Sequence, residues 1–197
     1  DACRQEMQHV NVGYQLDGTT TMGPVVNSKQ RDRVLSYLEK GVAQGADVVV
    51  PGGAAEVSGR NGFYVKPCLL SGSLGNVAAR EEIFGPVLQV VRAENLEEAA
   101  SLPSRHQYGN GVAIFTRNGL AAREFASKVN VGMVGINVPI PVPVAYHSFG
   151  GWKRSAFGDV NQHGTEGVRF YTKVKTMTQR WPSGDVDDQS FIIPTMQ

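Results

Sequence analysis

The residues with the clearest chemical potential surround a pair of carboxylates. Glu81 and Glu82 precede Phe84 and a Gly-Pro pair, at the start of an apolar segment over residues 86–91. A carboxylate at a strand end can accept hydrogen bonds from a ribose diol, as acidic residues do in dinucleotide sites, and an adjacent aromatic ring could pack against a flat base. From the residue types alone, the commoner explanation is a solvated pair of glutamates before a strand.

A second candidate is the glycine-rich segment 148–158, in which aromatic residues flank Gly150 and Gly151. Adjacent glycines permit positive φ or close backbone contact, so this loop could line a pocket or hold a phosphate with its amides. A plain tight loop explains the residues equally well, and the segment lacks the spacing of a phosphate-binding P-loop. The glycines over 48–59 do not fit the Gly-x-Gly-x-x-Gly fingerprint either.

The residues alone supply no nucleophile and no metal site. Cys68 lies between Pro67 and Leu69, and apolar surroundings raise a thiol pKa, so a buried structural cysteine is predicted. The four histidines show no metal-ligand spacing, and no serine stands in a Gly-x-Ser-x-Gly elbow.

The elements that must position these groups alternate between helices and short apolar strands. This pattern predicts an α/β fold with a mostly parallel sheet flanked by helices. Pro67 is expected to confine its extended segment to an edge or a bulge. The predicted buried residues are Val34, Leu35, Leu38 and Val42 in the first helix, and Leu120, Phe125 and Val129 in the last. The predicted helices cover 27–45, 95–102 and 119–128, and the predicted strands or extended segments cover 46–50 (buried), 62–70, 86–91, 111–116 and 131–137.

Two further segments are expected to be extended. Prolines at every second position over 139–143 favour an extended segment that forms a wall, in which proline provides no backbone N–H for pairing with a neighbouring strand. Apolar and basic residues alternate from Val168 to Lys175, which predicts a strand.

Composition narrows the class of protein. The chain has 197 residues, and 19 basic against 18 acidic side chains give a net charge of +1, which argues against nucleic-acid binding. No apolar run approaches the ~18 residues of a membrane span. With two cysteines and no visible signal peptide, a reducing, cytoplasmic setting is expected, and a start at Asp1 suggests a piece of a longer protein.

Seven motifs follow one another along the chain: Met22-Gly-Pro-Val-Val26, Gly62-Phe-Tyr-Val-x-Pro67, Glu81-Glu-Ile-Phe-Gly-Pro-Val87, Tyr108-Gly-x-Gly-Val-Ala-Ile-Phe-Thr116, Gly132-x-Val-Gly-Ile-Asn137, Phe149-Gly-Gly-x-Lys153 and Tyr171-Thr-x-Val-Lys-Thr176. In type and order these motifs resemble the C-terminal part of an aldehyde dehydrogenase. The resemblance implies a catalytic-domain-like fold in which Glu82 holds the nicotinamide ribose of NAD, Phe84 packs near the nicotinamide and Phe149 borders the substrate mouth.

Two segments, the proline-rich residues 139–143 and residues 147–159, are similar to one branch of the aldehyde dehydrogenases. Members of this CoA-acylating branch oxidise methylmalonate or malonate semialdehyde. In that chemistry a cysteine thiolate attacks the aldehyde, NAD takes the hydride, and the thioester passes to CoA. A related enzyme that uses NAD or NADP and passes the acyl group to water is the first alternative, and a non-catalytic folding or assembly module is the second.

The resemblance also implies what this chain lacks. The family nucleophile lies further upstream of the Gly23-Pro24 motif than this chain extends, and Cys3 does not match its surroundings. We therefore expect no catalytic residue and no NAD-binding domain here, and an inactive chain in isolation. Residues 1–22 are interpreted as the remnant of a helix and loop, 23–165 as the partial catalytic core, and 166–197 as a C-terminal oligomerisation strand and tail. A homo-oligomer, dimer or tetramer, is expected from this strand, and a strand that lies wholly within its own sheet is the alternative.

Overall fold

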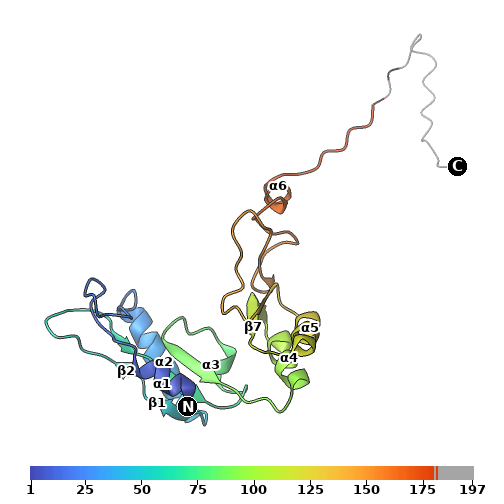
Figure 1. Ribbon diagram of the computed structural model, residues 1–197. Helices are drawn as coiled ribbons and strands as arrows, with labels where there is room; N and C mark the ends of the chain where they lie inside the picture. The colour runs from blue at the N-terminus through green and yellow to red at the C-terminus, as the bar shows by residue number, and fades with distance from the viewer. Residues whose placement is uncertain (180, 182–197) are drawn as a thin grey trace.

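The computed structural model describes residues 1–179 and 181. Two groups of elements follow one another along the chain, α1 to β5 and α4 to α6 (Figure 1). No helix in the part of the chain that the structure describes is both long and apolar enough to cross a membrane. The first group comprises α1 (Ala2–Gln8), α2 (Ser28–Ala43), β1 (Asp47–Val50), β2 (Gly53–Ala54), β3 (Val65–Lys66), β4 (Cys68–Ser71), α3 (Val77–Arg80) and β5 (Val87–Val90).

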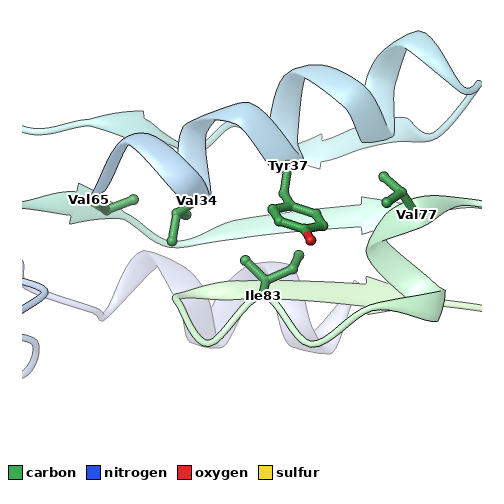
Figure 2. Packing of buried hydrophobic residues seen from close by; sticks show 5 residues of the cluster. All are labelled: Val34, Tyr37, Val65, Val77 and Ile83. Atoms are coloured by element: carbon green, nitrogen blue, oxygen red, sulfur yellow. The ribbon is translucent and has the colours of Figure 1, made fainter. Parts of the chain in front are cut away.

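Helix α2 organises the first group. Asn27 caps its start by accepting a hydrogen bond from the Gln30 backbone N–H at 2.9 Å. Gly45 follows its end with a φ of +86°, a conformation that favours glycine. The helix is confirmed, but Val42 is 46% exposed and not buried as predicted. The buried face instead carries Val34 and Tyr37, which pack with residues of β3, α3 and the loop before β5; the cluster is Val34, Tyr37, Val65, Val77 and Ile83 (Figure 2).

The sheet of the first group has the strand order β1-β4-β5. Its central strand, β4, is buried from Cys68 to Leu70, so the edge position predicted as one alternative is wrong. The other alternative was a bulge, and the register of the β1–β4 pair shifts between Val48 and Val50 of β1. Pro67 stands just before β4, where its missing N–H does not interrupt the strand. Strand β1 lies at the edge and is exposed over Asp47–Val49, which corrects its predicted burial.

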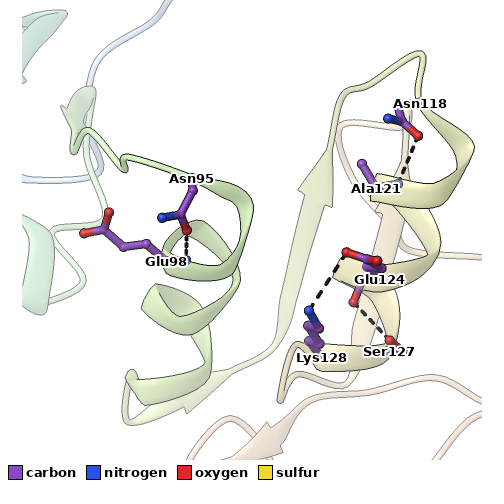
Figure 3. Close-up of polar contacts among 7 residues, drawn as sticks. All are labelled: Asn95, Glu98, Asn118, Ala121, Glu124, Ser127 and Lys128. Carbon is purple, nitrogen blue, oxygen red and sulfur yellow. Dashed lines mark hydrogen bonds and ion pairs between the residues drawn. The ribbon is translucent and has the colours of Figure 1, made fainter.

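The second group comprises α4 (Leu96–Arg105), β6 (Tyr108–Gly109), β7 (Gly111–Ile114), α5 (Gly119–Lys128), β8 (Met133–Ile136), β9 (Trp152–Lys153) and α6 (Glu166–Tyr171). Asn95 and Asn118 cap α4 and α5 by accepting backbone hydrogen bonds (Figure 3). Phe125 and Val129 enter the core as predicted. Leu120, in the first turn of α5, is 56% exposed and therefore was wrongly predicted to be buried.

Strand pairing is mixed. The pairs β4–β5 and β7–β8 are parallel, whereas β1–β4, β2–β3 and β6–β9 are antiparallel. The α/β class is confirmed. In the described residues the strands form four small sheets, of which β1-β4-β5 is mixed, β7-β8 is parallel and the other two are antiparallel. Two of the antiparallel pairs join strands of only two residues, which hydrophobic periodicity cannot detect.

The predicted strand from Val168 onward is wrong over its first residues, because Glu166–Tyr171 form helix α6. Alternation over four residues is too short to separate a strand from one helical turn. An ion pair at 3.5 Å joins Glu166 and Arg169 three residues apart, a spacing that favours the helix. Residues 180 and 182–197 of the predicted tail lie outside the described residues.

Candidate functional site

The loop between α3 and β5 presents two of the predicted site residues to the exterior. Ile83 is buried in the core cluster, while its neighbours Glu82 and Phe84 are exposed, Phe84 to 80%. Ile83 thus anchors the loop and leaves the carboxylate and the phenyl ring free to meet a ligand.

Helix α2 braces this loop from behind through backbone atoms. The Gln30 side-chain amide donates to the carbonyl oxygens of Ile83 at 3.0 Å and Phe84 at 2.8 Å. The Arg33 guanidinium donates to the carbonyl oxygen of Glu82 at 2.7 Å. Residues three apart lie on one helix face, so one side of α2 satisfies three successive carbonyl groups.

A third brace residue, Tyr37, donates its hydroxyl hydrogen bond to the Glu81 carboxylate. This hydrogen bond, together with burial, raises the pKa of the Tyr37 phenol above its ordinary value of 10.0. The Arg33 guanidinium lies 4.7 Å from the centre of the Tyr37 ring and acts in the opposite direction on this pKa. Glu81 therefore serves as a structural acceptor and Glu82 remains available.

The backbone of the loop is itself unusual. Phe84 adopts a φ of +62°, in the left-handed region that non-glycine residues seldom occupy. A side chain on Gly85 would collide with Val34, so the helix and the loop pack at glycine distance. Such strain persists only where surrounding contacts determine it, and here Gln30 and Val34 provide those contacts.

A cavity of about 470 Å³ separates the loop from the second group of elements. The His106 imidazole spans part of this boundary, because its Nε2 lies 3.1 Å from the carbonyl oxygen of Arg80. The cavity combines carboxylates with cationic and hydroxyl groups, and its lining residues are Glu81, Glu82, His106, Tyr108, Asn110, Arg154 and Ser155.

Phe149 lines a neighbouring cavity of about 470 Å³, which shares Asn110 and Ser155 with the first. Its ring stacks on the imidazole of His163, with ring centres 4.4 Å apart and planes 14° from parallel. The structure therefore places Glu82 and Phe149 at adjoining cavities. Phe84 lies in the braced loop but lines neither cavity.

The glycine pair beside Phe149 has a packing role. A Cβ on Gly132, just before β8, would collide with the carbonyl oxygen of Gly150, and one on Gly150 would collide with the side chain of Asn161. Close packing, against backbone at Gly132 and against a side chain at Gly150, therefore accounts for these two glycines.

Lys153 joins the same loop to helix α4. Its ammonium donates to the carbonyl oxygens of Pro103 at 3.0 Å and Ser104 at 3.2 Å, in the last turn of the helix. Cations are favourable at helix C-termini, where carbonyl groups lack partners. The lysine that ends the Phe-Gly-Gly-x-Lys motif thus attaches the glycine-rich loop to the C-terminus of α4.

Cys68 is 2% exposed, and burial raises the pKa of its thiol above the ordinary 9.0, although a hydrogen bond from Gly52 opposes this shift. The predicted structural role is consistent with this environment. Within residues 1–179 and 181, no three His, Cys, Asp or Glu residues are grouped so that they could hold a metal ion.

Sequence reasoning did not identify Gln30, Arg33 and Tyr37, or the pairing of His163 with Phe149. A signal for the first set was present, since polar side chains at positions 30, 33 and 37 follow helical spacing beside the buried Val34. No comparable local pattern links His163 to a residue fourteen positions earlier.

This α/β core, with its braced acidic-aromatic loop beside two cavities, is similar to proteins of known family and structure. The sequence model of the aldehyde dehydrogenase family matches residues 1–177, and the chain belongs to this family.

Within this family, individual relatives of the chain are dehydrogenases of malonate or methylmalonate semialdehyde. The chain is 52% identical over 194 residues to a malonate-semialdehyde dehydrogenase from Pseudomonas aeruginosa, covering 97% of this chain and 39% of the relative. It is 47% identical to a Caenorhabditis elegans protein described as a probable acylating methylmalonate-semialdehyde/malonate-semialdehyde dehydrogenase, covering 87% of this chain and 33% of that one.

Two solved structures of similar proteins carry descriptions of the same kind. The methylmalonate-semialdehyde dehydrogenase of Oceanimonas doudoroffii matches with a TM-score of 0.85 and 49% identity, over 95% of this chain and 39% of that chain. A protein from Sinorhizobium meliloti, assigned to the same class and complexed with NAD, matches with a TM-score of 0.84 and 52% identity, over 93% and 38% of the two chains. The chain thus spans about two fifths of the length of these relatives.

Proposed function

We propose that the chain forms the nicotinamide side and part of the substrate mouth of an NAD-dependent aldehyde dehydrogenase. The complete enzyme would convert methylmalonate or malonate semialdehyde to an acyl-CoA. The observation that carries the proposal is the loop 81–85, whose backbone is held by α2 while Glu82 and Phe84 remain exposed.

These residues fit NAD by the chemistry they offer. The exposed Glu82 carboxylate is an acceptor for both hydroxyl groups of a ribose, and it lines a cavity of about 470 Å³. The exposed phenyl ring of Phe84 offers a flat face for the nicotinamide and would exclude water from it. NAD, when bound, would accept the hydride from the aldehyde carbon.

Phe149 would border the aldehyde at the adjoining cavity. The similarity to acylating relatives supports CoA as the acyl acceptor, while the described residues alone do not distinguish CoA from water.

The deciding assay measures NADH formation by the complete protein that carries these residues, with malonate or methylmalonate semialdehyde and NAD, with and without CoA. We expect NADH formation that requires aldehyde and accelerates with CoA. A CoA-independent rate would assign water as the acceptor, and no oxidation of any short aldehyde would overturn the proposal.

The 197-residue chain alone is expected to form no NADH. Of its two cysteines, Cys68 is buried, and Cys3 does not match the surroundings of the family nucleophile. NADH formation by the isolated chain would show that a catalytic nucleophile lies within these residues.

We further propose that the C-terminal segment contacts a second copy of the enzyme. Apolar side chains on and after α6 are exposed, Val174 to 97%, and such surface is typical of an interface. Light scattering on the complete protein should give a dimer or tetramer, and a monomer at micromolar concentration would contradict this. The exposed residues are Val168, Tyr171, Val174, Met177 and Trp181.

A further inference from the structure

The segment around His163 runs beside the segment that carries Phe149. The Gly164 backbone N–H donates to the carbonyl oxygen of Ala145 at 3.1 Å. Gly164 has a φ of +64°, and a Cβ there would lie 2.6 Å from the backbone nitrogen of Ser148. Only glycine is therefore compatible with this close approach, which brings His163 level with Phe149.

The His163 ring contacts Phe149 through its face. The two planes lie 14° from parallel with centres 4.4 Å apart, at the short limit of about 4.5 Å for aromatic stacking. The Nδ1 atom of His163 is buried and has no hydrogen-bond partner among the described residues. Stacking therefore contributes directly to the position of this ring.

Phe149 and His163 both line the cavity of about 470 Å³, so whatever fixes the Phe149 ring also fixes part of the cavity wall. We propose that His163 is a positioning residue, which holds the Phe149 ring in place and thereby sets how tightly the aldehyde chain is bound. This inference rests on the proposed substrate role of Phe149. The neighbouring pair Tyr146–His147 has the same ring separation of 4.4 Å but planes 48° apart, and both of its residues are exposed.

The first test reads the Phe149 ring without requiring activity. 4-Fluorophenylalanine is placed at position 149 of the complete protein, and its fluorine NMR signal is compared between variants. His163→Ala should move the signal, whereas His163→Phe should keep it near the original position because a flat ring remains. His147→Ala is the matched control and should leave the signal unchanged. An unmoved signal in His163→Ala would overturn the positioning role.

The second test uses the kinetics of the complete enzyme. An aromatic pair contributes about 0.5–1.5 kcal/mol, which sets an upper limit of roughly 10-fold on the rise in the KM for aldehyde when the Phe149 ring is released. His163→Ala should show this rise with kcat and the KM for NAD unchanged, and His163→Phe should restore it. Equal changes in both KM values, or no rescue by His163→Phe, would overturn the substrate-binding part of the proposal.

The two proposals fail in different ways. If the unaltered enzyme oxidises no aldehyde, the proposed function fails, and the fluorine signal still decides whether His163 positions Phe149. If the enzyme is active and the signal does not respond to His163→Ala, the positioning role alone fails.

Discussion

The Tyr37 hydroxyl donates a hydrogen bond to the Glu81 carboxylate and so joins the middle of α2 to the residue before Glu82. The ring of Tyr37 packs in the same cluster as Ile83, which lies two residues after Glu81. One tyrosine therefore gives the candidate cofactor loop both a polar and an apolar attachment. This double attachment separates the two adjacent glutamates into one structural and one available carboxylate.

Tyr37→Phe removes the polar attachment and keeps the apolar one. Hydrogen bonds to charged groups contribute about 1.5–3 kcal/mol, so the free energy of unfolding should fall by about that amount in urea titrations. Tyr146→Phe, at an exposed tyrosine, should change it by less than about 0.5 kcal/mol. Equal stability of Tyr37→Phe and the unaltered chain would show that the hydrogen bond contributes nothing.

Stability should also fall at alkaline pH. Because the folded state raises the pKa of Tyr37, the unfolded chain loses this proton first as the pH rises. The contribution of the Tyr37 hydroxyl to the free energy of unfolding is complete below pH 10.0, the ordinary pKa of tyrosine. It is lost as the pH rises through the pKa of Tyr37 in the folded state. Urea titrations above and below pH 10.0 measure the slope, which should be shallower in Tyr37→Phe; identical slopes would exclude Tyr37 as the cause.

The two cysteines should react at very different rates with Ellman's reagent. Cys3 is exposed, whereas Cys68 is buried with a raised pKa, so little thiolate is available at neutral pH. One thiol should react quickly in the native chain and both in guanidinium. Cys3→Ser should remove the fast phase and Cys68→Ser should preserve it; a fast phase that survives in Cys3→Ser would disprove the burial argument.

Lys153→Met should loosen helix α4 from the glycine-rich loop. The change keeps most of the side-chain stem but removes two hydrogen bonds to the Pro103 and Ser104 carbonyl groups. We expect a loss of about 1–2 kcal/mol in the free energy of unfolding. Lys128→Met, at the exposed end of α5 with Glu124 at 3.9 Å, should cost less than about 0.5 kcal/mol. Equal losses in the two variants would rule out a specific anchor.

Glu82→Gln should weaken NAD binding in the complete enzyme. Arg33 holds only the carbonyl oxygen of residue 82, so the loop should keep its shape. Loss of a charged acceptor worth about 1.5–3 kcal/mol corresponds to a rise of about tenfold or more in the KM for NAD. Glu97→Gln, at an exposed residue in the first turn of α4, serves as the control. An unchanged KM in Glu82→Gln would remove Glu82 from the proposed cofactor site.

Helices α2, α4 and α5 were predicted well because each carries its own signals, whereas α3 and α6, of four and six residues, were not predicted. Asn27 caps α2, Gly45 follows its end, and Val34 marks the buried face, so all the information lies within one segment. Burial within strands depended on partners elsewhere in the chain. Val48 resembles a core residue in sequence but belongs to an edge strand, and its exposure follows from the strand order β1-β4-β5.

The candidate site was also predicted only in part: its proposed ligand-contacting residues were predicted, and the residues that hold them were not. Glu82, Phe84 and Phe149 were reached by resemblance to family motifs, which are local. Gln30 and Arg33 act on carbonyl groups about fifty residues away, and a contact to backbone atoms leaves no recognisable residue type at its other end. His163 meets Phe149 only because Gly164 permits two loops to approach.

Gln30 and Arg33 hold the carbonyl oxygens of residues 82–84, atoms that every amino acid possesses. Substitutions at Glu82 and Phe84 consequently leave the donors of the brace with the same acceptors. Positions 82 and 84 can therefore be varied together in a library that tests their proposed role in coenzyme preference. Proline and β-branched residues are left out at position 84, where φ is +62°. Gln30, Arg33 and Val34 are kept unchanged.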